Sequence, residues 1–250
     1  MTQEIKHFTI NSHFLQRDVM YSVRMAQQET NLYFYFFDGQ NLYSDEEAAY
    51  GYSWKLGEVV DELGIDANIV GIYSLGGMDR VAEYQPFPVE HAEQLENFVS
   101  DDFQARGEEA GRFIVHELIP EVEGQIAGHE RLVGGSSMGG VMALYLGQSY
   151  PSVFSRILAM STAGFFSPTA IAASCASYAK DDEQRVYLDV GTKESEDVGQ
   201  TMGYLLINRM LHGVLKTRVP VCYVEATDHI HREDAWHSRL PDALTYLLAK

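Results

Sequence analysis

A serine inside a glycine-rich stretch is the residue of this sequence best placed to do chemistry. Residues 134–140 read Gly-Gly-Ser-Ser-Met-Gly-Gly, follow a short apolar run and precede a segment typical of a helix. In a G-x-S-x-G frame, only Ser137 has glycines two positions before and after it. Such glycines allow a sharp strand-to-helix turn that presents the serine hydroxyl. Ser137 is therefore a candidate nucleophile, and the Met138 amide at the helix N-terminus could stabilise an oxyanion. The alternative is a glycine-rich turn with an incidental serine.

A serine nucleophile needs a base, and the base needs an acid that orients it. Candidates occur where two predicted strands end, which is where ligands bind in parallel sheets. The residues alone leave both assignments open: the acids are Asp189, Glu194 and Asp197, and the bases are His229 and His231. A metal site on Asp228 and the two histidines is a further reading of the His-x-His spacing. It is disfavoured because no other ligands cluster nearby, and no metal is expected.

The elements that would position these residues alternate between strands and helices. Strands are predicted at 4–11, 18–25, 32–37, 68–73, 132–133, 155–160, 185–190 and 219–226. Helices are predicted at 53–63, at 105–119 where Pro120 closes the helix, at 141–146, at 197–213 and near the C-terminus. This alternation predicts an α/β fold with a mostly parallel sheet covered by helices on both faces. The first two strands leave no room for a crossover helix, so that edge should be antiparallel.

Two segments between the elements are candidates for substrate recognition. No repeat or linker divides the chain, so a single domain over residues 1–250 is predicted. The connection at about 74–104 is long enough to suggest a functional role, and residues 161–182 resemble a cap that is partly helical. Phe165, Phe166 and Met160 are predicted to line a pocket for a small or medium acyl group, although packing of the cap would also explain them.

Composition narrows the classes of partner. The 250 residues are 46% hydrophobic, as in globular proteins, and carry a formal net charge of -18. An acidic surface repels nucleic acid, so no nucleic-acid partner is expected. No signal peptide and no membrane-spanning run is apparent, and no membrane partner is expected. The two cysteines, Cys175 and Cys222, suit a reducing compartment, which predicts a cytoplasmic location.

Five segments together resemble one family of enzymes. They are Phe37–Tyr43 (FDGQNLY), Asp79–Phe87 (DRVAEYQPF), Glu117–Pro120 (ELIP), the glycine-rich stretch around Ser137, and Gly191–Glu194 (GTKE) with His231 and Trp236 behind it. In this order they resemble the esterase-D and enterochelin-esterase branch of the α/β-hydrolases. That branch also holds S-formylglutathione hydrolases, feruloyl esterases and mycolyltransferases. The resemblance spans residues 37–236, and it implies an α/β-hydrolase fold.

The resemblance also implies the roles of particular residues. It assigns the acid to Glu194, at the fourth position of the G-x-x-[ED] turn. It assigns the base to His231, five positions before Trp236, and not to His229. It adds the backbone amide of Gln40, after Asp-Gly, as a second oxyanion donor. The chain departs from the family pattern at residues 226–230, where Ala-Thr-Asp-His-Ile replaces the usual Gly-Gly-His turn. A different approach to the histidine is therefore expected there.

These observations predict a serine carboxylesterase. It would hydrolyse small to medium acyl esters, or aryl esters, through an acyl-enzyme intermediate, with a small-molecule ester as its substrate. No metal and no organic cofactor is expected. The alternatives are an acyltransferase that uses the same triad, and a non-catalytic binding protein on a hydrolase scaffold.

Overall fold

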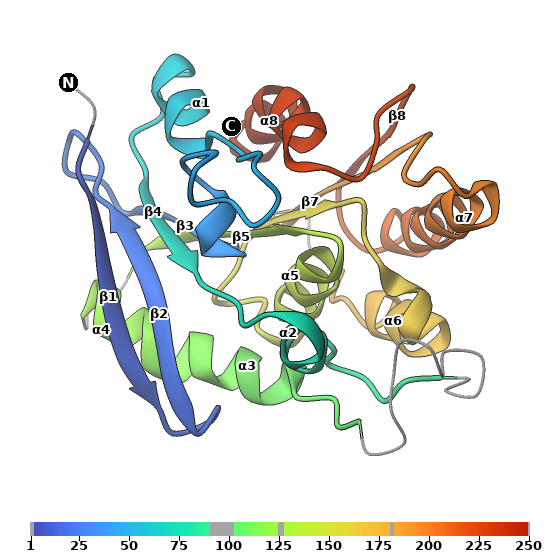
Figure 1. Ribbon diagram of the computed structural model, residues 1–250, viewed down its shortest axis with the longest axis horizontal. Helices are drawn as coiled ribbons and strands as arrows, with labels where there is room; N and C mark the ends of the chain where they lie inside the picture. The colour runs from blue at the N-terminus through green and yellow to red at the C-terminus, as the bar shows by residue number, and fades with distance from the viewer. Residues whose placement is uncertain (1–2, 91–102, 125–127, 181–182, 250) are drawn as a thin grey trace.

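One eight-stranded sheet organises the chain (Figure 1). The computed structural model describes residues 3–90, 103–124, 128–180 and 183–249. The strands are β1 Ile5–Ser12, β2 Arg17–Arg24, β3 Leu32–Phe37, β4 Asn68–Ile72, β5 Glu130–Ser136, β6 Arg156–Met160, β7 Arg185–Gly191 and β8 Val221–Ala226. Their order is β1-β2-β4-β3-β5-β6-β7-β8. The pairs β1–β2 and β2–β4 are antiparallel and all other pairs are parallel. The predicted mostly parallel sheet with an antiparallel N-terminal edge is therefore confirmed.

Helices cover both faces of this sheet (Figure 1). They are α1 Leu56–Glu62, α2 Gly77–Glu83, α3 Gly107–Phe113, α4 Ile119–Glu123, α5 Met138–Ser149, α6 Pro168–Ala176, α7 Val198–Leu215 and α8 Glu233–Leu248. Helices α1 and α8 contribute to one apolar cluster, whereas α3, α5, α6 and α7 contribute to the other. Strand β3 is apolar at every position because both of its faces are buried. Tyr35 packs in one apolar cluster, and its neighbours Phe34 and Phe36 pack in the other.

The helix before β5 does not end at Pro120 as predicted. Residues Ile114–Leu118 form a π-helical segment, and α4 continues directly from it. Pro120 stands in the first turn of α4, where a backbone N–H is not needed for the helix. The prediction was wrong because a proline can open a new helical segment as well as close an old one.

The two segments proposed for substrate recognition contain regular structure. The 74–104 connection includes α2, but its residues 91–102 lie outside the described residues. The 161–182 segment contains a 3-10 turn at Gly164–Phe166 followed by α6, and residues 181–182 lie outside the description. In the part of the chain that the structure describes, no helix combines the length and the apolar character needed to cross a membrane.

Candidate active site

Ser137 lies at a strained turn between β5 and α5. Its backbone has φ 56° and ψ −120°, a combination that is costly for a residue with a side chain. Hydrogen bonds hold the turn in place: the Ser137 amide donates to the Met160 carbonyl at 2.9 Å, and the Ala163 amide donates to the Ser137 carbonyl at 3.1 Å. Strand β6 and the residues that follow it thus hold a conformation that the chain would not adopt alone.

The glycines around Ser137 are required by close backbone contacts. A Cβ atom on Gly135 would lie 2.8 Å from the Gly139 carbonyl carbon, and one on Gly140 would lie 2.8 Å from Thr162 Oγ1. Both distances are shorter than side chains normally tolerate, so helix α5 can start this close to β5 and β6 only with glycine. The geometry is that of a nucleophile elbow.

His231 and Glu194 are joined directly. His231 Nδ1 lies 2.6 Å from Glu194 Oε2, and the glutamate side chain is fully buried. Glu194 Oε1 also accepts from Ser161 Oγ at 2.6 Å and from the Gly191 amide. Burial alone would raise the pKa of Glu194, but the hydrogen bonds from His231, Ser161 and Gly191 hold that pKa below its usual value. The carboxylate is therefore ionised at neutral pH and can orient the imidazole.

The other two candidate acids have different partners. Asp189 is completely buried, and its Oδ2 lies 2.9 Å from Arg239 Nε. Burial raises the pKa of Asp189 to about 6, against the opposing charge of Arg239. Asp197 caps helix α7 by accepting from the Gln200 amide at 2.7 Å. Neither makes a hydrogen bond to a histidine within the described ranges, so Glu194 alone has the geometry of an orienting acid.

The two candidate bases, His229 and His231, differ in their position relative to Ser137. His231 lies in the wall of the pocket that contains Ser137, whereas His229 does not line it. The His229 Nδ1 atom is buried and has no hydrogen-bond partner among the described residues. Nor do those residues include a group of three or more His, Cys, Asp or Glu side chains that could hold a metal ion.

Gln40, Ser137 and His231 share the wall of one pocket of about 520 Å³. Gln40 lies in a 3-10 turn after Asp38, whose left-handed conformation has φ 56°. Arg80 holds the Asp38 carboxylate through two hydrogen bonds of 2.7 and 2.6 Å, which fixes this turn. Gln40 and Met138 lie in the first turns of their helical segments, where backbone amides have no acceptor within the helix. Both amides can therefore donate to a ligand.

No hydrogen bond joins Ser137 Oγ to the His231 ring among the described residues. Such contacts are often long in unliganded enzymes and shorten when substrate binds. The nearby Tyr204 of helix α7 packs against the His231 ring, with 4.8 Å between centroids, and the Ser137 hydroxyl lowers the pKa of its phenol. Tyr204 could not be predicted as a site residue, because it lies 67 positions after Ser137 and only the folded sheet brings α7 near the elbow.

The three residues predicted to line an acyl pocket occupy different environments. Met160 is fully buried among the side chains shared with α1 and α8, so it is a core residue in this structure. Phe166 is 8% exposed and packs in the opposite apolar cluster. Phe165 is 38% exposed, and its ring centroid lies 5.2 Å from that of Tyr204. Only Phe165 borders the site, and none of the three lines the pocket that contains Ser137.

A buried network behind the site also escaped prediction. Ser161, which donates to Glu194, itself accepts from Trp236 Nε1 at 2.9 Å and from Arg239 Nη2 at 3.2 Å. The Trp236 ring packs edge-on against His231, with 4.9 Å between centroids. Ser161 has a left-handed φ of 46°, a non-glycine conformation that marks a constrained position. One set of side chains therefore supports both the acid and the base.

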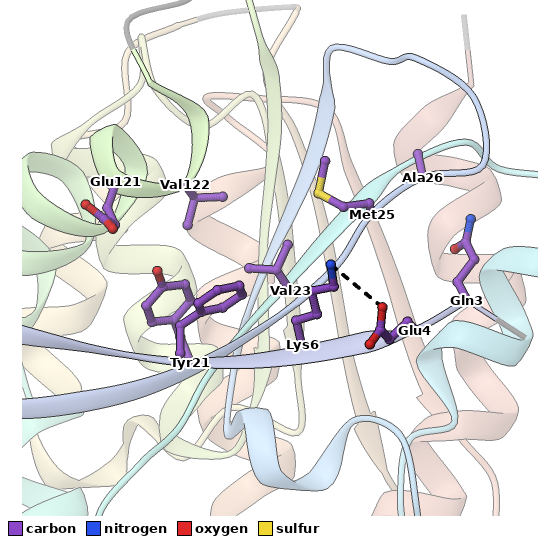
Figure 2. Close-up of a pocket in the computed structure, with 10 residues that line it drawn as sticks. Gln3, Glu4, Lys6, Tyr21, Val23, Met25, Ala26, Glu121 and Val122 are labelled. Atoms are coloured by element: carbon purple, nitrogen blue, oxygen red, sulfur yellow. Dashed lines mark ion pairs between the residues drawn. The ribbon is translucent and has the colours of Figure 1, made fainter.

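A second pocket lies at the N-terminal edge of the sheet (Figure 2). It has a volume of about 530 Å³ and lies between the β1–β2 hairpin and α4. Figure 2 shows Tyr21, Val23 and Met25 along the hairpin, with Glu121 and Val122 facing them. An exposed Lys6–Glu4 ion pair lies on the same hairpin. None of these side chains is a candidate nucleophile, base or acid.

The sheet order and the elbow define an α/β-hydrolase fold, and comparison with solved structures agrees. An IroE-like serine hydrolase from Shewanella oneidensis has 17% identity and a TM-score of 0.78, covering 97% of this chain and 79% of its own. Enterochelin esterase from Shigella flexneri has 17% identity and a TM-score of 0.72, covering 100% of this chain and 60% of its own. The siderophore hydrolase EstB from Aspergillus nidulans has 15% identity and a TM-score of 0.69, covering 97% and 94%.

The family assignment comes from the sequence itself. The family model described as "Putative esterase" matches residues 12–247, and the chain belongs to that family. The protein is therefore a carboxylic ester hydrolase. No curated protein matches the sequence.

Proposed function

We propose that the protein is a serine carboxylesterase in which Ser137, His231 and Glu194 form the catalytic triad. The observation that carries this proposal is the coincidence of three features in one place. Ser137 occupies a strained elbow, His231 shares its pocket, and Glu194 is bonded to His231 Nδ1 at 2.6 Å from behind. The bond from Nδ1–H leaves Nε2 of the imidazole unprotonated, as a general base requires.

In the first half-reaction, Ser137 Oγ attacks the ester carbonyl carbon while His231 Nε2 takes the hydroxyl proton. The carbonyl oxygen becomes an oxyanion, to which the amides of Gln40 and Met138 donate. The ionised Glu194 stabilises the imidazolium. The intermediate then collapses: the C–O bond to the alcohol breaks, and His231 returns its proton to the alcohol oxygen. In the second half-reaction, water attacks the acyl-enzyme by the same route and releases the acid.

The proposed substrate is a small to medium acyl ester or an aryl ester. A pocket of about 520 Å³ is within the range of small-molecule sites. Tyr50 and Tyr73 line it beside the polar side chains of Ser74 and Arg80, which would suit a ring that carries hydrogen-bonding groups. The structural neighbours include a ferulic acid esterase, whose name supports an ester with an aromatic group. A free thiol on each of Cys175 and Cys222 accords with the proposed cytoplasmic location.

Hydrolysis of p-nitrophenyl acetate by Ser137→Ala and Ser136→Ala tests the proposal. Ser137→Ala should lose roughly 10³-fold or more of kcat, because only binding and the oxyanion amides remain. Ser136→Ala should retain most activity, since the Ser136 backbone belongs to β5 and not to the strained turn. An active Ser137→Ala protein with unchanged melting temperature would refute the serine mechanism. A panel of acyl lengths and aryl esters, with Ser137→Ala as the blank, would then define the substrate.

A further inference from the structure

Tyr204 lies beside His231, and the proposed mechanism gives it no role. It projects from helix α7, and its ring lies between those of Phe165 and His231. The centroid distances are 5.2 Å to Phe165 at 88° and 4.8 Å to His231 at 41°. Two aromatic neighbours fix the plane of the phenol, so the direction of its hydroxyl is also fixed. The Ser137 hydroxyl is close enough to that phenol to lower its pKa.

The phenol is a hydrogen-bond donor throughout the working range of an esterase. Burial raises the pKa of Tyr204 to about 12, although the interaction with Ser137 lowers it. The nearby negative charge of Glu194 also raises the pKa, because it disfavours a phenolate. At pH 7 to 8 the group is therefore neutral. It can donate a hydrogen bond to a developing negative charge, and it keeps its own proton.

The position of Tyr204 relative to the triad indicates which oxygen it would reach. Two oxygens gain negative charge during acylation. The carbonyl oxygen lies on the side of the Gln40 and Met138 amides. The alcohol oxygen must lie between Ser137 and His231, because His231 protonates it. Tyr204 packs against the ring of His231, with 4.8 Å between centroids, so it is on the side of the departing alcohol.

We propose that Tyr204 is a further catalytic residue, whose hydroxyl donates a hydrogen bond to the alcohol oxygen of the ester as that oxygen leaves. This proposal rests on the Ser137 mechanism. When the tetrahedral intermediate collapses, the electron pair of the breaking C–O bond moves to the alcohol oxygen. The proton comes from the His231 imidazolium, and Tyr204 stabilises the charge until the proton arrives. No other group is consumed or oxidised.

A series of acetate esters with one acyl group and different leaving groups tests the proposal. The variant is Tyr204→Phe, which removes the hydroxyl and keeps the ring against Phe165 and His231. The measured quantity is kcat/KM, which reports the acylation half-reaction. The p-nitrophenolate group leaves readily without assistance, whereas phenolate and especially an alkoxide such as that of ethyl acetate need help. We expect a loss below about threefold on p-nitrophenyl acetate, and a loss of roughly 10- to 100-fold on ethyl acetate.

Two results would overturn the proposal. An equal loss on every ester would mean that Tyr204 only supports the His231 ring or the fold. No loss on any ester would mean that its hydroxyl has no part in acylation. Tyr223→Phe is the matched control, because its hydroxyl bonds Glu225 at 2.9 Å and its ring stacks on His212 rather than on His231. It should show no dependence on the leaving group.

The same series measured on Ser137→Ala separates this proposal from the mechanism on which it rests. If Ser137→Ala is inactive and Tyr204→Phe shows no dependence on the leaving group, only the role of Tyr204 fails. If Ser137→Ala remains active, the serine mechanism itself fails. Melting temperatures of all variants identify any loss that comes from unfolding.

Discussion

Replacement of Glu194 by glutamine should lower kcat by roughly 10³-fold while the chain stays folded. The structure sets this magnitude. When His231 becomes an imidazolium, it faces a buried carboxylate whose oxygen is 2.6 Å from Nδ1. Opposite charges about 4 Å apart at an effective dielectric constant near 20 interact by about 4 kcal/mol, which corresponds to roughly three factors of ten in rate. Glutamine has nearly the same shape and no charge, so the change isolates this electrostatic effect.

Asp189→Asn is the matched control, because Asp189 is also fully buried and its Oδ1 accepts from the Ser161 amide at 3.2 Å. Its partner is Arg239, so its loss leaves a buried guanidinium without a counter-charge. Breaking a buried ion pair costs up to about 3–5 kcal/mol of unfolding free energy, which would lower the melting temperature by roughly 6–20 °C. The cost here should be smaller, because the raised pKa of Asp189 shows that burial already disfavours its charged form. Asp189→Asn should reduce kcat by less than about tenfold, since Asp189 makes no contact with the imidazole.

The assay is steady-state hydrolysis of p-nitrophenyl acetate at pH 8, with melting followed by circular dichroism. Burial raises the pKa of Asp189 to about 6, so both carboxylates are ionised at this pH. A raised acid pKa means that the contribution of Asp189 to stability declines as pH increases from about 4 to 6. The melting temperatures should therefore be compared at one pH. A folded but inactive Asp189→Asn protein, with normal Glu194→Gln activity, would refute the assignment of the acid.

The remaining predictions concern the base, the aromatic wall and the elbow. His231→Ala should match the loss seen for Ser137→Ala, and His229→Ala should keep substantial activity; equal losses in hydrolysis assays would show that the base is misassigned. Phe165→Ala should change the preferred acyl length with turnover of acetate retained, which a chain-length series measures; an unaltered profile with only a lower melting temperature would make Phe165 structural. Gly135→Ala should lower both stability and activity, because the new Cβ would lie 2.8 Å from the backbone of α5; wild-type melting and rate would contradict the proposed elbow packing.

The elements were predictable where local pattern and burial coincide. The predicted strand at residues 32–37 has the same two ends as β3, Leu32–Phe37. A strand covered on both faces needs apolar side chains at every position, so its apolar run marks its bounds. Pro120 misled the prediction, since the π-helical segment before it has no distinct sequence signal. Met160 and Phe166 could not be placed from sequence either. A large apolar side chain after a strand can face a pocket or the core, and only the packing of α1, α7 and α8 distinguishes the two.

Sequence alone does not show which of two carboxylates orients the base, because their partners are distant in the chain. Asp189 and Glu194 are five positions apart, are both buried, and both bond Ser161. They differ in their cationic partner: Arg239, six positions into α8, is paired with Asp189, and His231, two positions before α8, is paired with Glu194. The segment from His231 through the first turns of α8 therefore distinguishes the two carboxylates. With Asp189 balanced by a permanent cation, Glu194 carries the charge that can respond when His231 gains a proton, which is the condition for an acid that assists catalysis.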